Sequence, residues 1–201
     1  MDSTLTTRFE LQLASDPRRR SEVEDAVISL IRLVGEDPTR DGLIDTPRRV
    51  LEAMREMTAG YREDPAEILS TTFDETSDEL IVLRGIEFYS ICEHHLLPFY
   101  GTASIGYLPG KVVGISKLAR LVNCYGRRLQ IQERLTRQIA ESIQTYLHAR
   151  GTAVIIRAHH LCMGCRGVKL PSTEMITSAM LGTMRQDAVT RTEFLRLCGA
   201  T

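Results

Sequence analysis

The residues best suited to chemistry in this chain are cysteines and histidines, most of which fall into two short clusters. Cys92 and His95 belong to the segment CEHH, and the second cluster, HHLCMGC, contains Cys162 and Cys165. A thiolate and an imidazole separated by two residues can bind one zinc ion from a single turn. Because soft ligands from two segments can share one ion, the sequence predicts a metal site that joins the clusters.

Two kinds of metal site are compatible with this spacing. In a closed site, Cys92, His95, Cys162 and Cys165 all bind zinc, and the ion only stabilises the fold. In an open site, three of these residues bind zinc and the fourth position holds a water molecule whose pKa falls to about 7. Spacing alone does not choose between them.

Two further histidines favour the open, catalytic site. His94 and His160 each lie near a predicted ligand, where an imidazole can move protons beside a metal-bound water molecule. A closed structural site has no need of them. For either histidine taken singly, a hydrogen-bonded residue without a catalytic role is the commoner explanation, and it is the pairing that favours catalysis.

Basic residues provide a candidate site for an anion. Ser116, Lys117 and Arg120 lie in the first turns of a predicted helix, where backbone N–H groups and the helix dipole favour negative charge. Arg166 and Arg49 are further candidates to bind phosphate groups, because guanidinium groups make bidentate contacts. A solvated basic helix surface is the alternative interpretation.

A carboxylate and an amide provide a candidate site for a purine base. Glu133 can accept paired hydrogen bonds from the N1 and exocyclic amine donors of guanine, and Gln132 can add one more contact. The alternative for Glu133 is a surface carboxylate near a helix start.

The elements that must position these residues are predicted from hydrophobic periodicity. Ser21 and Glu24 form a capping box before a helix that ends near Gly35, and a second helix runs from Thr46 to Gly60. These two helices are expected to form a hairpin. Strands are expected over residues 79–91, on both sides of Pro109 and Gly110, and over 152–162 and 174–182; helices over 116–128, around 135–147 and over 190–198.

This order of elements predicts an α+β fold, an antiparallel sheet with two helices packed on one face. The expected organisation is a flexible arm over residues 1–20, an N-terminal helical region over 21–75 and a catalytic domain over 76–201.

Composition excludes several classes of function. The chain has 201 residues, with 25 basic and 26 acidic side chains, so it lacks the positive field that non-specific nucleic-acid binding requires. No segment is apolar enough for a membrane span or a signal peptide, so a cytoplasmic protein is expected, with neither a nucleic acid nor a membrane as partner. Five cysteines, an odd number, favour free thiols or metal ligands over disulfides.

Three segments resemble the successive signatures of the GTP cyclohydrolase I family: CEHHLLPFYGTASIGYLP, GISKLARLVNCYGRRLQIQERLTRQIA and HHLCMGCRGV. The resemblance extends from DTPRRV at residue 45 to RTEFLRL near residue 197. It implies the tunnelling fold, a homodecamer with active sites at subunit interfaces, Zn²⁺ as cofactor and GTP as substrate. The implied reaction opens the guanine imidazole ring, releases formate and gives dihydroneopterin triphosphate.

The resemblance also implies a role for each matching residue. Zinc would be held by Cys92, His95 and Cys162, and the catalytic residues would be His94, His160 and Ser116. Guanine would be bound by Gln132 and Glu133, and the triphosphate by Ser116, Lys117, Arg120, Arg166 and Arg49. Cys165 departs from the family pattern and keeps the closed site, a non-catalytic zinc-stapled module, as the alternative. A nitrile reductase of the queuosine pathway shares the fold but does not require these zinc ligands.

Overall fold

The computed structural model describes residues 17–75 and 77–199 of the chain. The chain divides into two compact units, which meet in sequence at Thr58 and Ala59. Most of the arm predicted over residues 1–20 lies outside the described residues, but residues 17–20 are helical. The predicted boundary between residues 75 and 76 falls within the second unit and stays a prediction.

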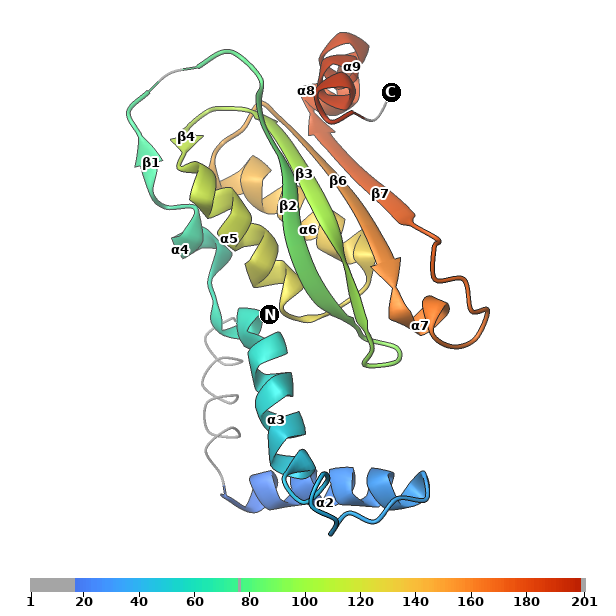
Figure 1. Cartoon of the computed structure of the whole chain (residues 1–201). Coiled ribbons are helices and arrows are strands. Elements are labelled where there is room, and N and C mark those ends of the chain that lie inside the picture. The colour runs from blue at the N-terminus through green and yellow to red at the C-terminus, as the bar shows by residue number, and fades with distance from the viewer. Residues whose placement is uncertain (1–16, 76, 200–201) are drawn as a thin grey trace. The chain divides into compact units, whose positions relative to one another are not determined.

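The N-terminal unit contains two helices, α2 (Pro17–Leu33) and α3 (Thr46–Met57). They pack against each other, which confirms the two predicted helices and their contact, but in Figure 1 they cross at a steep angle and do not run side by side as in a tight hairpin. The prediction that the first helix starts at Ser21 is wrong, because Pro17 suits a first turn and the following arginines are good helix formers. α3 begins at Thr46 as predicted, with Pro47 in its first turn.

A five-stranded sheet forms the centre of the second unit, in the order β5-β2-β3-β6-β7 (Figure 1). The four long strands are antiparallel to their neighbours, and β5 runs parallel to the end of β2. The sheet therefore confirms the predicted antiparallel architecture. Its strands are β2 (Ile81–Cys92), β3 (Pro98–Leu108), β5 (Leu129–Gln130), β6 (Gly151–His160) and β7 (Met175–Gly182).

Two strands do flank the turn at Pro109 and Gly110, but they do not pair with each other. The second of them, β4 (Val112–Val113), pairs instead with β1 (Thr72–Phe73). Both edges of β3 are already occupied, by β2 and β6, so β4 has to leave the main sheet.

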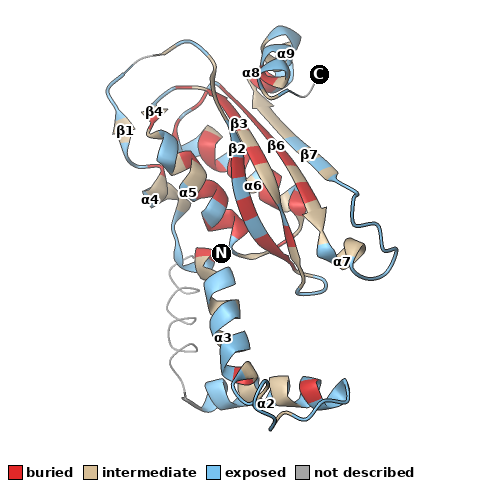
Figure 2. Ribbon diagram, in the orientation of Figure 1, coloured by how far each residue is buried: buried red, intermediate tan, exposed pale blue. Residues whose placement is uncertain are grey.

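The helices α5 (Ile115–Gly126) and α6 (Gln132–Tyr146) cover one face of the sheet. Their apolar sides and the facing strand residues form the main core, which appears as buried residues between the two layers in Figure 2. This arrangement confirms the α+β fold with two helices on one face, as in the tunnelling fold.

A smaller core lies on the opposite face of the sheet, near the C-terminus. Phe194 of α9 (Ala188–Leu197) is fully buried there with Met184 of α8 (Thr183–Gln186). Gly106 permits this contact, because a Cβ atom at that position would lie 2.4 Å from the Phe194 ring. The remaining short helices are η1 (Ala59–Arg62), α4 (Pro65–Ile68) and α7 (Leu161–Gly164). None of the helices in the described part of the chain is long and apolar enough to cross a membrane.

Candidate active site

Several elements of the second unit meet at one end of the sheet. β2 ends at Cys92, β6 ends at His160, and the register places His160 opposite Phe99 at the start of β3. β5 places Gln130 opposite Cys92, and α6 begins two residues later at Gln132. The strand register therefore brings both Cys/His clusters and the start of α6 to the same place.

Cys92, His95 and Cys162 form a group that can hold a metal ion. Their ligand atoms all lie within 4.8 Å of one another, and the Cys92 Sγ is 3.8 Å from the His95 Nδ1. The turn after β2 produces this pair, since the Cys92 carbonyl accepts hydrogen bonds from the backbone N–H groups of His95 and Leu96. Two thiolates and one imidazole are donors that suit Zn²⁺, so the side chains present fit this ion.

The environment of the thiols explains why a cation would be favoured here. Burial raises the pKa of the Cys162 thiol, the neighbouring Cys92 raises it further, and Arg166 lowers it. Two adjacent thiolates repel each other, and a divalent cation between them removes that repulsion. Metal uptake at this group is therefore expected to release protons.

Cys165 is separate from the metal-binding group. Its side chain is exposed, and its thiol donates a hydrogen bond to the Leu161 carbonyl at 2.9 Å. Within residues 17–75 and 77–199, the group consists of Cys92, His95 and Cys162, without a fourth cysteine, histidine or acidic ligand. This geometry favours the open site over the closed one.

His160 is held beside the metal-binding group in a fixed orientation. Its ring stacks on Phe99, with ring centroids 4.6 Å apart and planes inclined by 2°. Its Nε2 lies 2.8 Å from the Oε1 of Gln132. Burial lowers the pKa of His160, while the Glu133 carboxylate acts in the opposite direction. An imidazole held in one orientation beside a metal-binding group is suited to exchange protons with a bound ligand.

His94 is exposed next to the same group. Its Nδ1 lies 4.0 Å from the Cys92 Sγ, and its Nε2 lies 4.0 Å from a carboxylate oxygen of Glu93. With a side chain that is 64% exposed, His94 is free to meet a ligand that approaches from solvent.

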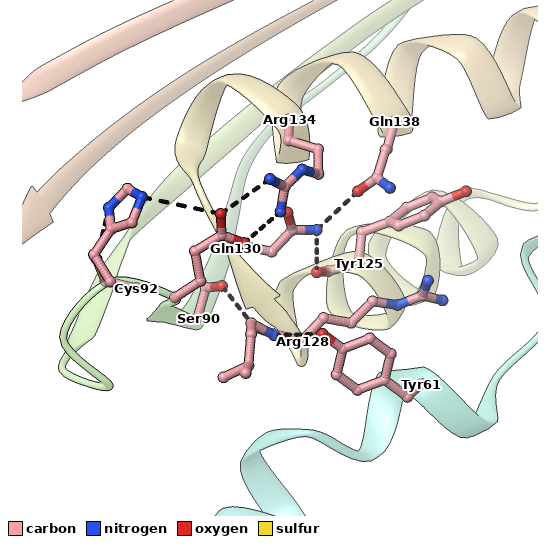
Figure 3. Close-up of polar contacts among 11 residues, drawn as sticks. Tyr61, Ser90, Cys92, Tyr125, Arg128, Gln130, Arg134 and Gln138 are labelled. Carbon is pink, nitrogen blue, oxygen red and sulfur yellow. Dashed lines mark hydrogen bonds and ion pairs between the residues drawn. The ribbon is translucent and has the colours of Figure 1, made fainter. Parts of the chain in front are cut away.

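An ion pair between Glu93 and Arg134 was not predicted from the sequence. Arg134 donates two hydrogen bonds to the Glu93 carboxylate, one of them at 3.0 Å, and they hold the pKa of Glu93 below its usual range. Figure 3 shows Arg134 of α6 reaching toward the segment that contains Cys92. The pair ties the turn after β2 to the start of α6. The sequence indicates this pair only in that Glu93 directly follows Cys92 and Arg134 directly follows Glu133.

The first two residues of α6 have opposite environments. Gln132 is 1% exposed, and its side chain is hydrogen-bonded inside the protein. Glu133 is exposed and lines a hollow of about 630 Å³ between α6 and β7, together with Thr177 and Arg185. Glu133 is therefore accessible to a ligand, whereas Gln132 is not.

Ser116, Lys117 and Arg120 do not belong to the metal-binding group. Ser116 and Lys117 lie in the first turn of α5, next to β4, and Arg120 lies near its middle, whereas the end of α5 leads directly into β5 beside Cys92. Along the helix axis, Ser116 and Lys117 lie about 14 to 15 Å from the C-terminal end of α5, and Arg120 lies about 9 Å from it.

The two remaining predicted arginines are exposed. Arg166 lies just after α7, near enough to Cys162 to lower the pKa of that thiol. Arg49 belongs to the N-terminal unit, where it forms an ion pair with Asp45 at 3.1 Å.

Together, the fold and the site define an α+β protein with a three-residue metal-binding group beside a buried histidine, at one end of an antiparallel sheet. The family model for GTP cyclohydrolase I matches residues 23–199. The chain belongs to the GTP cyclohydrolase I family, and it is therefore an enzyme of the hydrolase class.

Curated relatives agree with this assignment. The chain is 51% identical to a GTP cyclohydrolase 1 of Chlorobaculum tepidum over 177 residues, which cover 87% of this chain and 79% of the relative. It is 52% identical to a GTP cyclohydrolase 1 of Alkalilimnicola ehrlichii, over 87% of this chain and 96% of the relative. A crystal structure of the archaeosine synthase QueF-Like in the apo form matches with a TM-score of 0.44 and 19% identity, covering 53% of this chain and 97% of that one.

Proposed function

We propose that this protein opens the imidazole ring of GTP, releases C8 as formate and rearranges the product to 7,8-dihydroneopterin triphosphate. The observation that supports this proposal is the grouping of Cys92, His95 and Cys162 next to His160 and an accessible Glu133. We assign Zn²⁺ to the three-residue group, with Cys165 outside it. When bound, such an ion lowers the pKa of a water molecule, which makes a nucleophile available at neutral pH.

The protein side chains bind and orient the purine around that nucleophile. His160, protonated on both ring nitrogens, donates a proton to N7 of guanine and becomes neutral, because charge that develops on the ring nitrogen needs a nearby acid. Glu133 accepts hydrogen bonds from N1 and the exocyclic amine, which holds C8 toward the metal-binding group. His94 and Ser116 transfer protons at the ribose during the later rearrangement.

The triphosphate is bound by Ser116, Lys117, Arg120, Arg166 and Arg49. Because Ser116 and Lys117 lie at the far end of α5 from the metal-binding group, we assign them, together with Arg120 on the same helix, to the site of a second copy of the chain. A homo-oligomer with active sites between subunits, such as a ring of ten, accounts for this separation. A reducing compartment such as the cytoplasm keeps the thiol ligands available.

The composite site predicts that two inactive variants complement each other. His160→Ala removes a residue of the metal half, and Lys117→Ala removes one of the phosphate half. Subunits mixed by co-expression should recover about one quarter of wild-type turnover, because that fraction of sites combines two intact halves. The control is a mixture of His160→Ala with Glu133→Ala, both from the metal half, which should recover none. A His160→Ala and Lys117→Ala mixture as inactive as its parents would place the whole site within one subunit.

Glu133→Gln is expected to weaken the recognition of guanine. The substitution replaces one acceptor by an N–H₂ group, which faces a donor of the base, so kcat/KM for GTP should fall on the order of 10²-fold. The preference for GTP over ITP, which lacks the exocyclic amine, should shrink in the same kinetic comparison. Glu141→Gln, an exposed substitution later in α6, is the matched control and should leave both values unchanged. Normal GTP kinetics for Glu133→Gln would refute the purine assignment.

A further inference from the structure

The Gln132 side chain is buried beside His160, and all of its polar atoms are hydrogen-bonded. Its Nε2 donates to the Ile156 carbonyl at 3.1 Å, the Met175 carbonyl at 3.0 Å and the Thr177 Oγ1 at 3.1 Å. Its Oε1 lies 2.8 Å from the His160 Nε2. An amide with this set of partners has no donor left for a guanine base.

The chemistry of these partners fixes which way the amide faces. Backbone carbonyls only accept hydrogen bonds, so the N–H₂ group has to face Ile156 and Met175. The opposite orientation would place three oxygen atoms together inside the protein and leave buried acceptors unpaired, which is costly. The Oε1 of Gln132 therefore faces His160.

Two threonines support the same orientation. The Thr136 hydroxyl donates to the Gln132 backbone carbonyl at 2.7 Å and lies 2.6 Å from the Thr177 hydroxyl. Since the Thr136 proton is already used, the Thr177 hydroxyl donates to Thr136, and its lone pair remains available to the Gln132 Nε2. The two N–H protons of Gln132 thus serve three acceptors, one of them shared, and the directions of all these bonds agree with a single orientation of the amide.

An oxygen that only accepts requires a donor opposite it. We propose that Gln132 is a positioning residue, which keeps a proton on the Nε2 of His160 and leaves Nδ1 as the atom that exchanges protons with the substrate. Stacking on Phe99 fixes the plane of the His160 ring, and with it the direction of both ring nitrogens. The proposal rests on the catalytic role of His160 proposed above, and it replaces the predicted contact between Gln132 and guanine.

The direct test is the tautomer of His160 in the zinc-loaded, full-length protein. With ¹⁵N-labelled histidine, solid-state NMR at about pH 8 separates Nε2–H from Nδ1–H forms of a neutral ring. The sequence has only 5 histidines, and the His160 signals are those missing from a His160→Gln variant. We expect a protonated Nε2 and an unprotonated Nδ1. A His160 ring protonated on Nδ1 alone would overturn the proposal, whether or not the protein turns over GTP.

Kinetics separate positioning from guanine binding. Gln132→Met should lower kcat for GTP on the order of 10²-fold while KM stays within about threefold, because a misoriented acid affects only the transition state. Gln138→Met is the matched control, since it also removes an amide of α6, in this case a half-buried one that bonds Gln130 instead (Figure 3). A raised KM with unchanged kcat would instead assign Gln132 to guanine and overturn the proposal.

If Gln132→Met does not fold, the tautomer of His160 measured in the wild-type protein still tests the proposal. A wild-type protein without turnover would defeat the proposed function and leave the tautomer measurement intact.

Discussion

Cys162→Ala is expected to deprive the protein of both its metal and its activity. Cys162 supplies one of two thiol ligands, and a site left with one thiol and one imidazole holds zinc poorly. After dialysis, zinc should fall from about one ion per subunit to under about a tenth. Turnover of GTP should fall at least about 10³-fold, since the ion contributes several kcal/mol to the reaction. Atomic absorption and formate release measure the two effects.

Cys165→Ala provides the matched control for this prediction. Cys165 lies three positions after Cys162, yet its exposed thiol bonds the Leu161 carbonyl and stands apart from the metal-binding group. The variant should keep its zinc and its turnover. If Cys165→Ala loses zinc as completely as Cys162→Ala, the site is a closed one with four ligands, and the proposed open position does not exist.

His160→Ala is expected to stop ring opening while zinc stays bound. A positioned acid contributes about 10²-fold to 10⁴-fold to such a reaction, so formate release should fall by this factor. The zinc content should match that of the wild type, because the three ligand atoms do not include His160. Both quantities are measured on the same preparation.

The neighbouring histidine offers a control for His160. His159 points away from the site, toward the Thr173 carbonyl and the Tyr100 ring, so His159→Ala should preserve most of the activity. Loss of zinc from His160→Ala would show that a ligand had been mistaken for an acid. Turnover within about threefold of wild type would remove His160 from the mechanism altogether.

Local patterns in the sequence predicted the parts of the site that a single turn creates. Cys92 and His95 lie three residues apart, so one turn after a strand suffices to bring them together. Cys162 joins them only through the pairing of β3 with β6, which periodicity does not specify. Matching ligand chemistry joined the two clusters in the sequence analysis, and the resemblance to a known family then selected Cys92, His95 and Cys162 as the three ligands.

The interactions that could not be predicted depend on contacts between distant segments. Glu93 and Arg134 are 41 residues apart, and neither charge differs in pattern from an ordinary solvated residue. The environment of Gln132 depends on carbonyl groups of β6 and β7, so its sequence position next to Glu133 suggested a shared role that its hydrogen bonds do not support. In the same way, the sequence predicted a strand after Pro109 and Gly110 but not its partner, which is β1, because β2 and β6 already occupy both edges of β3.

The helix starts show how local preferences can mislead by a few residues. Ser21 and Glu24 match a capping box, yet α2 begins at Pro17. The residues between Pro17 and Ser21 are arginines, which also favour a helix. Thr46 and Pro47 gave a correct start for α3, since proline both permits the first turn and excludes an earlier one. A proline therefore locates the start of a helix more closely than a capping pattern alone.

The most direct test of the central claim is to incubate the zinc-loaded wild-type protein with GTP and measure formate together with the pterin product. We expect formate and a fluorescent neopterin triphosphate, after oxidation, in equal amounts. Zinc fully bound with no formate released would contradict the open catalytic site and would support a zinc-stapled module without catalytic activity.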